Sequence, residues 1–181
     1  MGAPGALGGV ALLALALLGI AVRRARLEPM LVQGESMRPT LEPGQRIAVG
    51  PVRGTPRRGE LVVLRRPERE VVKRVVGLPG ERVVLAGGRL EVDGRQLAEP
   101  YVAARPPRRD AVELDVHLGP DELLVLGDSR GHSTDGRSFG PVRGDDLIGI
   151  VRFAYWPPRR LVPTGKRPRG ISVNRVRMPR F

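Results

Sequence analysis

The sequence contains no cysteine, and this absence removes several kinds of chemistry at once. Disulfide bridges, thiol nucleophiles and cysteine-based metal sites are all excluded. The two histidines, His117 and His132, lie apart in the chain and are too few to build a histidine metal site. The sequence therefore predicts that the protein works without a metal or another cofactor.

Aromatic side chains are also scarce, at 3% of residues, which argues against a stacking platform for single-stranded nucleic acid. The net charge of +12 would otherwise suggest a nucleic-acid partner. Eight of the 31 basic residues lie within residues 157–181, together with five prolines and no acidic residue. We predict that residues 157–181 form a disordered basic tail, attracted to anionic lipid or simply solvated, and we expect no nucleic-acid partner.

Charged side chains are absent from residues 6–22, an apolar run that is long enough to span a bilayer as a helix. The main alternative is a cleavable signal peptide, for which Gly19 and Ala21 provide small residues at a suitable spacing. No basic side chain precedes the run, however, and the run is longer than the apolar part of a typical signal peptide. We therefore predict a retained transmembrane anchor with its basic flank over residues 1–26.

After this segment the pattern changes to short runs rich in valine, leucine and isoleucine, separated by glycine and proline. Such runs predict β-strands, and "RVVLAGGRLEV" predicts a hairpin with a Gly-Gly turn. The fold class is mainly β, an antiparallel sandwich or partly closed barrel. The expected strands cover residues 46–49, 60–64, 70–76, 82–85, 89–92, 111–118, 122–126 and 147–153. Residues 98–110 are expected to form a surface loop.

Lysine is rare among the basic residues: the chain has 29 arginines but only two lysines, Lys73 and Lys166. Lys73 lies between valines in "EVVKRVV", where burial would lower its pKa by several units, whereas Arg74 would stay charged. A neutral amine near pH 8 is a general base. The alternative is a solvated strand lysine, and strand alternation does not decide because both faces of this run are apolar.

Serine is scarce too, and one of the five serines, Ser36, lies in the turn-like stretch "VQGESMRPTLEPGQ". Gly34 permits an unusual backbone angle there, so the turn can expose a hydroxyl and aim backbone N–H groups at one place. A serine nucleophile needs a base. His132 with Asp128 or Asp135 would give a Ser-His-Asp arrangement, and Lys73 would give a Ser-Lys dyad.

Three motifs occur in a specific order: "GESMRPTL", "VVKRVVGLPGE" and "GDSRGHSTDGRSFG". Together they resemble the bacterial type I signal peptidases, the membrane-anchored Ser-Lys proteases of the S26 class, over residues 32–151. The resemblance implies a signal-peptidase-like antiparallel β catalytic core, here residues 27–156, carrying one N-terminal transmembrane helix. It implies that Ser36 is the nucleophile, that Lys73 is the general base, and that Ser133 hydrogen-bonds the lysine amine. The implied supporting ion pairs use Asp128, Asp135, Arg137 and Arg74.

The chain departs from the family pattern at three supporting positions. Ser129 replaces an asparagine, Gly136 replaces a second serine, and Gly34 stands where some members carry a side-chain oxyanion donor. The oxyanion hole would then depend on backbone N–H groups, chiefly that of Ser36. His132 falls at a variable position of the last motif and is expected on a surface loop.

The implied activity is removal of N-terminal signal peptides from exported preproteins that have small residues just before the cut. Lipid bilayer and preprotein are the implied partners, and the active site would lie on the outer face of the cell membrane. Three arginines follow the apolar run and favour a cytoplasmic domain, but long domains translocate largely regardless of charge, so we favour the exported orientation.

Alternative functions remain open at this point. The chain would also suit a specialised maturation protease of the same class, acting on one partner precursor. A non-enzymatic alternative is a membrane-tethered basic module that binds nucleic acid or anionic lipid. The related self-cleaving repressors are disfavoured because no DNA-binding helical domain precedes the motifs.

Overall fold

The computed structural model describes residues 26–102, 112–157 and 170–175. The predicted anchor lies almost entirely outside these residues. In the described part of the chain, no helix has the length and apolarity that crossing a membrane requires.

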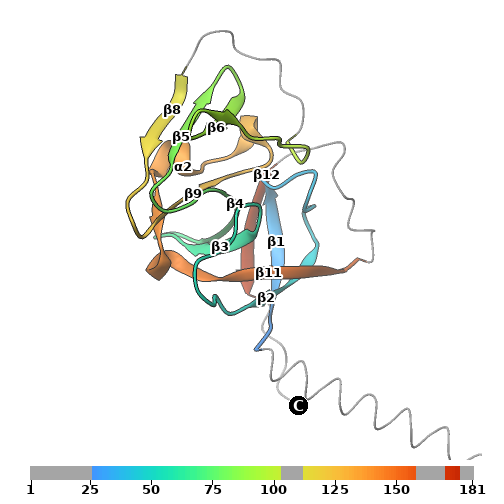
Figure 1. The fold of residues 1–181 in the computed structure, drawn as a ribbon. Helices are drawn as coiled ribbons and strands as arrows, with labels where there is room; N and C mark the ends of the chain where they lie inside the picture. Colours follow the sequence, from blue (N-terminus) through green and yellow to red (C-terminus); the bar gives the residue numbers. More distant parts are fainter. Residues whose placement is uncertain (1–25, 103–111, 158–169, 176–181) are drawn as a thin grey trace, which may run out of the picture.

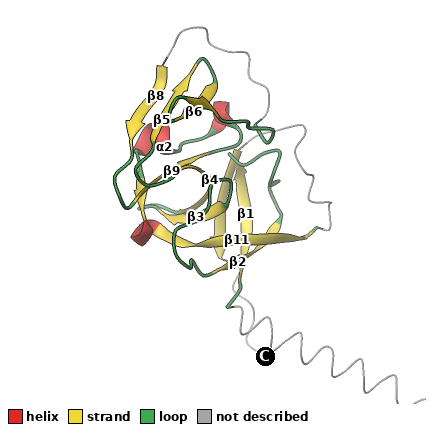
Figure 2. Cartoon of the chain, in the orientation of Figure 1, coloured by secondary structure: helices red, strands yellow, loops and turns green. Residues whose placement is uncertain are grey.

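The described residues are mainly β, and all of their paired strands are antiparallel, as the sequence predicts (Figures 1 and 2). Helices are confined to three short pieces. The elements are β1 (Glu28–Glu35), β2 (Arg46–Gly50), β3 (Leu61–Arg65), β4 (Glu70–Gly77), β5 (Arg82–Ala86), β6 (Arg89–Val92), β7 (Arg95–Gln96), β8 (Val112–His117), β9 (Glu122–Leu126), η1 (Arg130–His132), α2 (Gly136–Phe139), β10 (Val142–Arg143), η2 (Gly144–Asp146), β11 (Leu147–Trp156) and β12 (Gly170–Arg175). All eight expected strands are confirmed, with ends displaced by three residues at most.

The larger sheet closes on itself. Its strand order is β10-β9-β4-β12-β1-β2-β11-β3, and β3 also pairs with β4. The ring therefore runs β4, β12, β1, β2, β11, β3 and back to β4, while β9 and β10 extend from the far part of β4. Within this ring β4 pairs with β3 from Glu70 to Arg74 on one edge, and on the other edge it pairs with β12 at Glu70 and with β9 from Arg74 to Gly77.

A smaller sheet, of order β7-β6-β5-β8, lies at one end of this barrel (Figure 1). Its β5–β6 hairpin has the predicted Gly-Gly turn: Ala86 pairs with Arg89, and Gly87 and Gly88 have φ values of 55° and 77°. A two-residue turn with positive φ at both positions matches the twist of the flanking strands. This geometry explains why two glycines occupy the turn.

The core explains why alternation along β4 is uninformative. Val72 packs with one buried cluster, Val71 and Val75 with a second, and Val76 with a third that lies under the smaller sheet. Both faces of β4 are thus buried, and a lysine on either face would lose its water. The chemistry of the side chain, and not the strand period, identifies Lys73.

One part of the predicted disordered tail is a strand. Gly170–Arg175 form β12, which pairs with β1 from Met30 opposite Arg175 to Glu35 opposite Gly170. The prediction is wrong for these six residues because "GISVNR" alternates apolar and polar residues in strand fashion, a signal that the surrounding prolines and charges conceal. The remainder, residues 158–169 and 176–181, lies outside the described residues.

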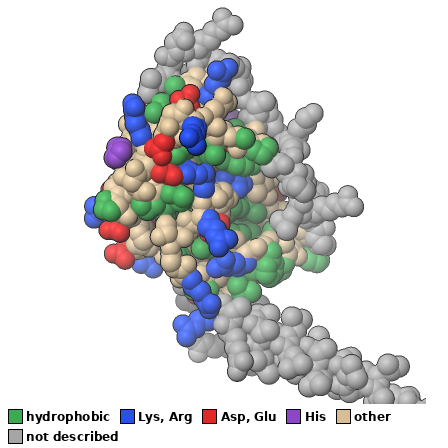
Figure 3. Space-filling model, viewed as in Figure 1, with side chains coloured by type: hydrophobic (Ala, Val, Ile, Leu, Met, Phe, Trp, Pro, Cys, Tyr) green, Lys and Arg blue, Asp and Glu red, His purple; other side chains and the backbone are tan. Residues whose placement is uncertain are grey.

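Basic side chains are spread over the face drawn in Figure 3, with acidic side chains among them. Large apolar side chains are exposed mainly at the end of β11, at Phe153, Tyr155 and Trp156.

Candidate active site

Ser36 is the first residue after β1, in a turn that the sequence fixes from both sides. Gly34 has a φ of 80°, the left-handed conformation expected of this glycine. After the serine, Met37 and Leu41 are buried in the barrel core, and the Leu41 N–H donates to the Met37 carbonyl at 2.9 Å. The turn is therefore anchored by apolar packing on one side and by a special backbone angle on the other.

Lys73, from the middle of β4, meets this turn. Its Nζ lies 2.5 Å from Ser36 Oγ, a short hydrogen bond between two side chains that are 2% and 3% exposed. Burial lowers the pKa of Lys73 from 10.5 to about 8. The charges of Asp135 and Asp128 act in the opposite direction and raise this pKa, whereas the charge of Arg69 lowers it further. A buried hydroxyl beside an amine that is about half neutral near pH 8 is the pairing that a Ser-Lys dyad requires.

The competing Ser-His-Asp arrangement is not formed. His132 is exposed at the end of η1, as expected for a surface residue, and His117 is exposed on β8. The basic side chain that the structure brings to Ser36 is Lys73.

Asp128 and Arg74 form the first supporting ion pair. Arg74 Nε and Nη2 donate to the two Asp128 oxygens at 2.8 and 2.6 Å, and the Asp128 side chain is fully buried. Thr40 Oγ1 donates to the same carboxylate at 2.5 Å, and Arg74 Nη1 donates to the Gly59 carbonyl at 2.7 Å. This pair joins β4 to the loop after β9 directly beside Lys73.

Asp135 and Arg137 form the second pair, at the start of α2. The carboxylate accepts from Arg137 Nε at 2.9 Å, from Arg137 Nη2 at 3.0 Å and from the Gly127 N–H at 2.9 Å. Although burial acts the other way, these bonds and the Arg137 charge hold the pKa of Asp135 below its ordinary value. The carboxylate stays ionised, and its charge partly offsets the desolvation of Lys73.

Ser133 differs from the expectation. Its hydroxyl is buried but makes no hydrogen bond to Lys73, and it lies close enough to Asp135 to help lower the pKa of that carboxyl. A Cβ placed on Gly127 would meet Ser133 Oγ, so the hydroxyl packs against the Gly127 backbone. The Ser133–Lys73 bond implied by the resemblance is absent from this structure.

Comparisons with known proteins bear on this arrangement. A family model described as "Signal peptidase, peptidase S26" matches residues 7–156. The chain is 34% identical over 169 residues to a signal peptidase I of Leptolyngbya laminosa, which covers 83% of this chain and 79% of that protein. It is 32% identical over 164 residues to signal peptidase I T of Bacillus subtilis (strain 168), covering 82% of this chain and 84% of the relative.

The chain belongs to the S26 signal peptidase family. Among solved structures, a signal peptidase I from Enterococcus faecalis matches 52% of this chain and 95% of its own, with 28% identity and a TM-score of 0.46.

Two of the departures from the S26 pattern have visible consequences. At Gly136 a Cβ would come within 2.8 Å of the Val125 carbonyl oxygen, so this chain has no room for the serine of the family motif. At Ser129 the contact to the site comes from the backbone: the Ser129 N–H donates a hydrogen bond to the Ser36 carbonyl at 3.0 Å. This bond ties the last motif to the turn that carries Ser36.

Several residues of the site were not singled out by sequence. Thr40 and Gly127 lie inside the quoted motifs, and a Cβ on Gly127 would come within 2.6 Å of the Ser36 carbonyl oxygen, so only glycine fits there. Glu99 and Tyr101 lie in the stretch predicted as a surface loop. The loop is confirmed, since residues 98–102 form no helix or strand, but these two side chains turn inward: the Glu99 side chain is 8% exposed, and the Tyr101 ring packs on Arg74. Residues 103–111 of the stretch lie outside the described residues.

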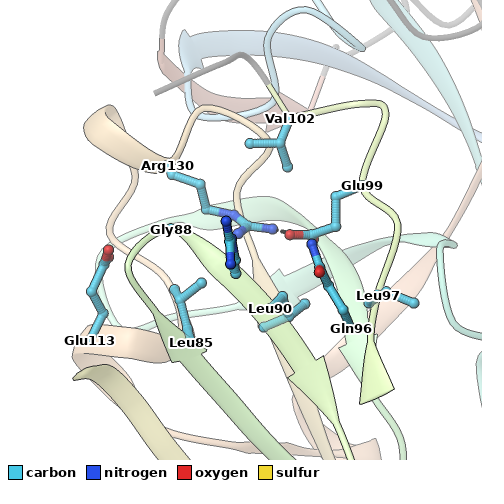
Figure 4. A pocket seen from close by; sticks show the side chains of 10 residues that line it. Leu85, Gly88, Leu90, Gln96, Leu97, Glu99, Val102, Glu113 and Arg130 are labelled. Atoms are coloured by element: carbon cyan, nitrogen blue, oxygen red, sulfur yellow. Dashed lines mark hydrogen bonds and ion pairs between the residues drawn. The ribbon is translucent and has the colours of Figure 1, made fainter. Parts of the chain in front are cut away.

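Glu99 also lines a cavity of about 230 Å³ between the smaller sheet and η1, where Figure 4 shows it facing Arg130. The dyad itself lies outside this cavity. Among the described residues, no group of three or more histidines or carboxylates could hold a metal ion.

Proposed function

We propose that this chain is a membrane-anchored serine endopeptidase that removes N-terminal signal peptides from exported preproteins, with Ser36 as nucleophile and Lys73 as general base. The observation that carries the proposal is the buried 2.5 Å contact between Ser36 Oγ and Lys73 Nζ, in a setting that lowers the pKa of the amine to about 8. Membership of the S26 family, and relatives named signal peptidase I, support the same activity.

Each cycle uses the amine twice. Neutral Lys73 takes the Ser36 hydroxyl proton while Oγ attacks the carbonyl carbon before the cut, and the resulting ammonium gives that proton to the leaving amine. The mature protein departs, and the signal peptide stays on Ser36 as an ester. Lys73 then takes a proton from water, whose oxygen attacks the ester, and the proton returns to Ser36.

The carbonyl oxygen gains negative charge in both attacks. Gly34 offers no side-chain donor, so we expect the backbone N–H of Ser36 to stabilise that charge. The bond from the Ser129 N–H to the Ser36 carbonyl, at 3.0 Å, holds this part of the turn in place. Asp128 and Asp135, fixed by Arg74 and Arg137, supply charge beside the amine without competing for the hydroxyl.

The proposal is tested by incubating the detergent-solubilised protein with a preprotein and measuring the released product by mass spectrometry. Wild type is expected to cleave, and Ser36→Ala is expected to lose all cleavage. Lys73→Arg should be as inactive as Ser36→Ala while its thermal unfolding stays cooperative, because arginine cannot become neutral. The chain's other lysine provides the matched control: Lys166→Arg should cleave like wild type.

Other results would favour the alternatives. A membrane-tethered basic binding module keeps its charge, and so its binding, in Lys73→Arg. A specialised maturation protease would cleave one precursor and leave other preproteins intact. Loss of Ser36 without loss of cleavage would contradict the dyad itself.

Membrane anchoring through residues 6–22 and an extracytoplasmic catalytic domain belong to the same proposal. Signal peptides reach such an enzyme only on the outer face of the membrane. A reporter fused to the carboxyl terminus is therefore expected to be active only outside the cytoplasm. A reporter that is active only in the cytoplasm would contradict the general signal peptidase function and favour the specialised protease.

A further inference from the structure

Two arginines hold the backbone on either side of the dyad. Arg74 follows Lys73 in β4 and grips Asp128 with two hydrogen bonds. Arg130 follows Ser129, whose N–H holds the Ser36 carbonyl, and its Nε donates to the Gly127 carbonyl at 3.1 Å. Arg74 is the chain neighbour of Lys73, and Arg130 is the chain neighbour of Ser129. A rotation of either guanidinium would therefore shift the backbone next to a residue of the site.

A single short segment contacts both guanidiniums. The Tyr101 ring covers the flat face of Arg74, with 4.0 Å from the guanidinium carbon to the ring centroid. The Tyr101 hydroxyl donates to Glu99 Oε1 at 2.9 Å, and the same oxygen is paired with Arg130 Nη2 (Figure 4). Among the residues that the structure describes, Arg130 and Glu99 have some of the least exposed charged side chains, at 5% and 8%.

The four side chains that make up this chain of contacts have complementary chemistry. A guanidinium over an aromatic face is attracted most strongly where water is excluded. Burial, with Glu99 next to it, raises the pKa of the Tyr101 hydroxyl above its ordinary value, so the hydroxyl remains a donor throughout the working range of pH. The Tyr101 ring thus packs on Arg74, and the Tyr101 hydroxyl donates to Glu99, the carboxylate that pairs with Arg130.

We propose that Tyr101 is a positioning residue for the cleavage proposed above: its ring fixes Arg74, and its hydroxyl, through Glu99, fixes Arg130. The inference rests on the proposed function, since positioning has meaning only if Ser36 and Lys73 perform the reaction. Tyr101 acts through the two arginines, by keeping the β4 segment and the loop after β9 in the register that brings hydroxyl and amine together.

The test separates ring from hydroxyl. Tyr101→Phe keeps the ring over Arg74 and loses the bond to Glu99, so kcat on a signal-peptide substrate should fall about 5-fold. Tyr101→Leu loses both interactions, and kcat should fall about 30-fold. KM should stay within about 2-fold of wild type in both variants, because the proposed role of this side chain is to hold the reacting groups in place and not to bind substrate. Glu99→Gln should resemble Tyr101→Phe, and combining the two should cost less than the product of the single losses.

The chain's other tyrosine is the matched control. Tyr155 is 40% exposed on β11, and Tyr155→Leu should leave kcat within about 2-fold of wild type. All assays run well below the unfolding midpoint of each variant, so that a loss of kcat reports geometry and not unfolded protein.

Unchanged kcat in folded Tyr101→Leu, or a loss confined to KM, would overturn the proposal. If the leucine variant does not fold, Tyr101→Phe decides alone, and a kcat within 2-fold of wild type overturns it. Failure of the proposed function looks different, because wild type itself would then fail to cleave, or Ser36→Ala would still cleave.

Discussion

Lys73→Met is expected to abolish cleavage and, at the same time, to stabilise the fold. Methionine has nearly the length of lysine but carries no base, so kcat/KM should fall by at least about 10³-fold. The gain in stability follows from the burial of the amine, which is 2% exposed and whose pKa is lowered from 10.5 to about 8. Function and stability therefore oppose each other at this one position.

Whether stability rises or falls with pH depends on which state, folded or unfolded, binds more protons. Between pH 8 and pH 10.5 the unfolded chain keeps the Lys73 proton and the folded protein releases it, so stability rises with pH across this window. Below pH 8 both states are protonated, and the folded state carries the full cost of burying the charge. A shift of this size corresponds to about 3 kcal/mol, which is the gain expected for Lys73→Met at pH 7.

Urea unfolding of wild type and Lys73→Met at pH 7 and pH 10 measures this directly. The difference between the two proteins cancels the titration of all other groups, so it isolates Lys73. The stability advantage of the methionine variant should shrink as pH rises from 7 to 10. An advantage that does not change with pH would contradict the lowered pKa, and an active Lys73→Met would exclude Lys73 as the base.

Most of the fold can be predicted from sequence because its strands are short, apolar and separated by glycine and proline. The Gly87-Gly88 turn is the clearest case, since two positive φ angles in succession leave few other residue choices. Ser36 and Lys73 can be predicted too, from chemistry and from a motif order, although 37 positions separate them in the chain. The sequence signal for the turn is local. The signal for Ser36 and Lys73 comes from residue types that are rare in this chain.

What escapes prediction depends on contacts between distant segments. Gly170–Arg175 carry a local strand pattern, but their place in the barrel depends on the gap between β1 and β4, which lie far from them in the chain. The partial burial of Glu99 and Tyr101 within their loop comes from contacts with Arg130 and Arg74, which lie far from them in the chain. Ser133 illustrates the same limit within a motif: its role was inferred from resemblance, and the packing of Gly127 places its hydroxyl elsewhere.

The buried Asp128–Arg74 pair gives the second large effect. Asp128→Ala is expected to lower the free energy of unfolding by about 3–5 kcal/mol, because it leaves the Arg74 guanidinium, only 11% exposed, without its carboxylate. Thr40 loses its acceptor in the same step. Since the total free energy of unfolding of a small domain is about 5–15 kcal/mol, this variant should unfold at a far lower urea concentration than wild type.

A second aspartate provides a matched comparison with the same bond pattern. Asp115 accepts from Arg82 Nε at 3.0 Å and Nη2 at 2.7 Å, much as Asp128 accepts from Arg74, but both partners are exposed. Water can replace the lost bonds there, so Asp115→Ala should leave the urea midpoint almost unchanged. Equal losses in the two variants would show that burial does not set the cost of breaking the Asp128 pair. A large loss in Asp128→Ala alone would show that the cost arises because the Asp128–Arg74 pair is buried.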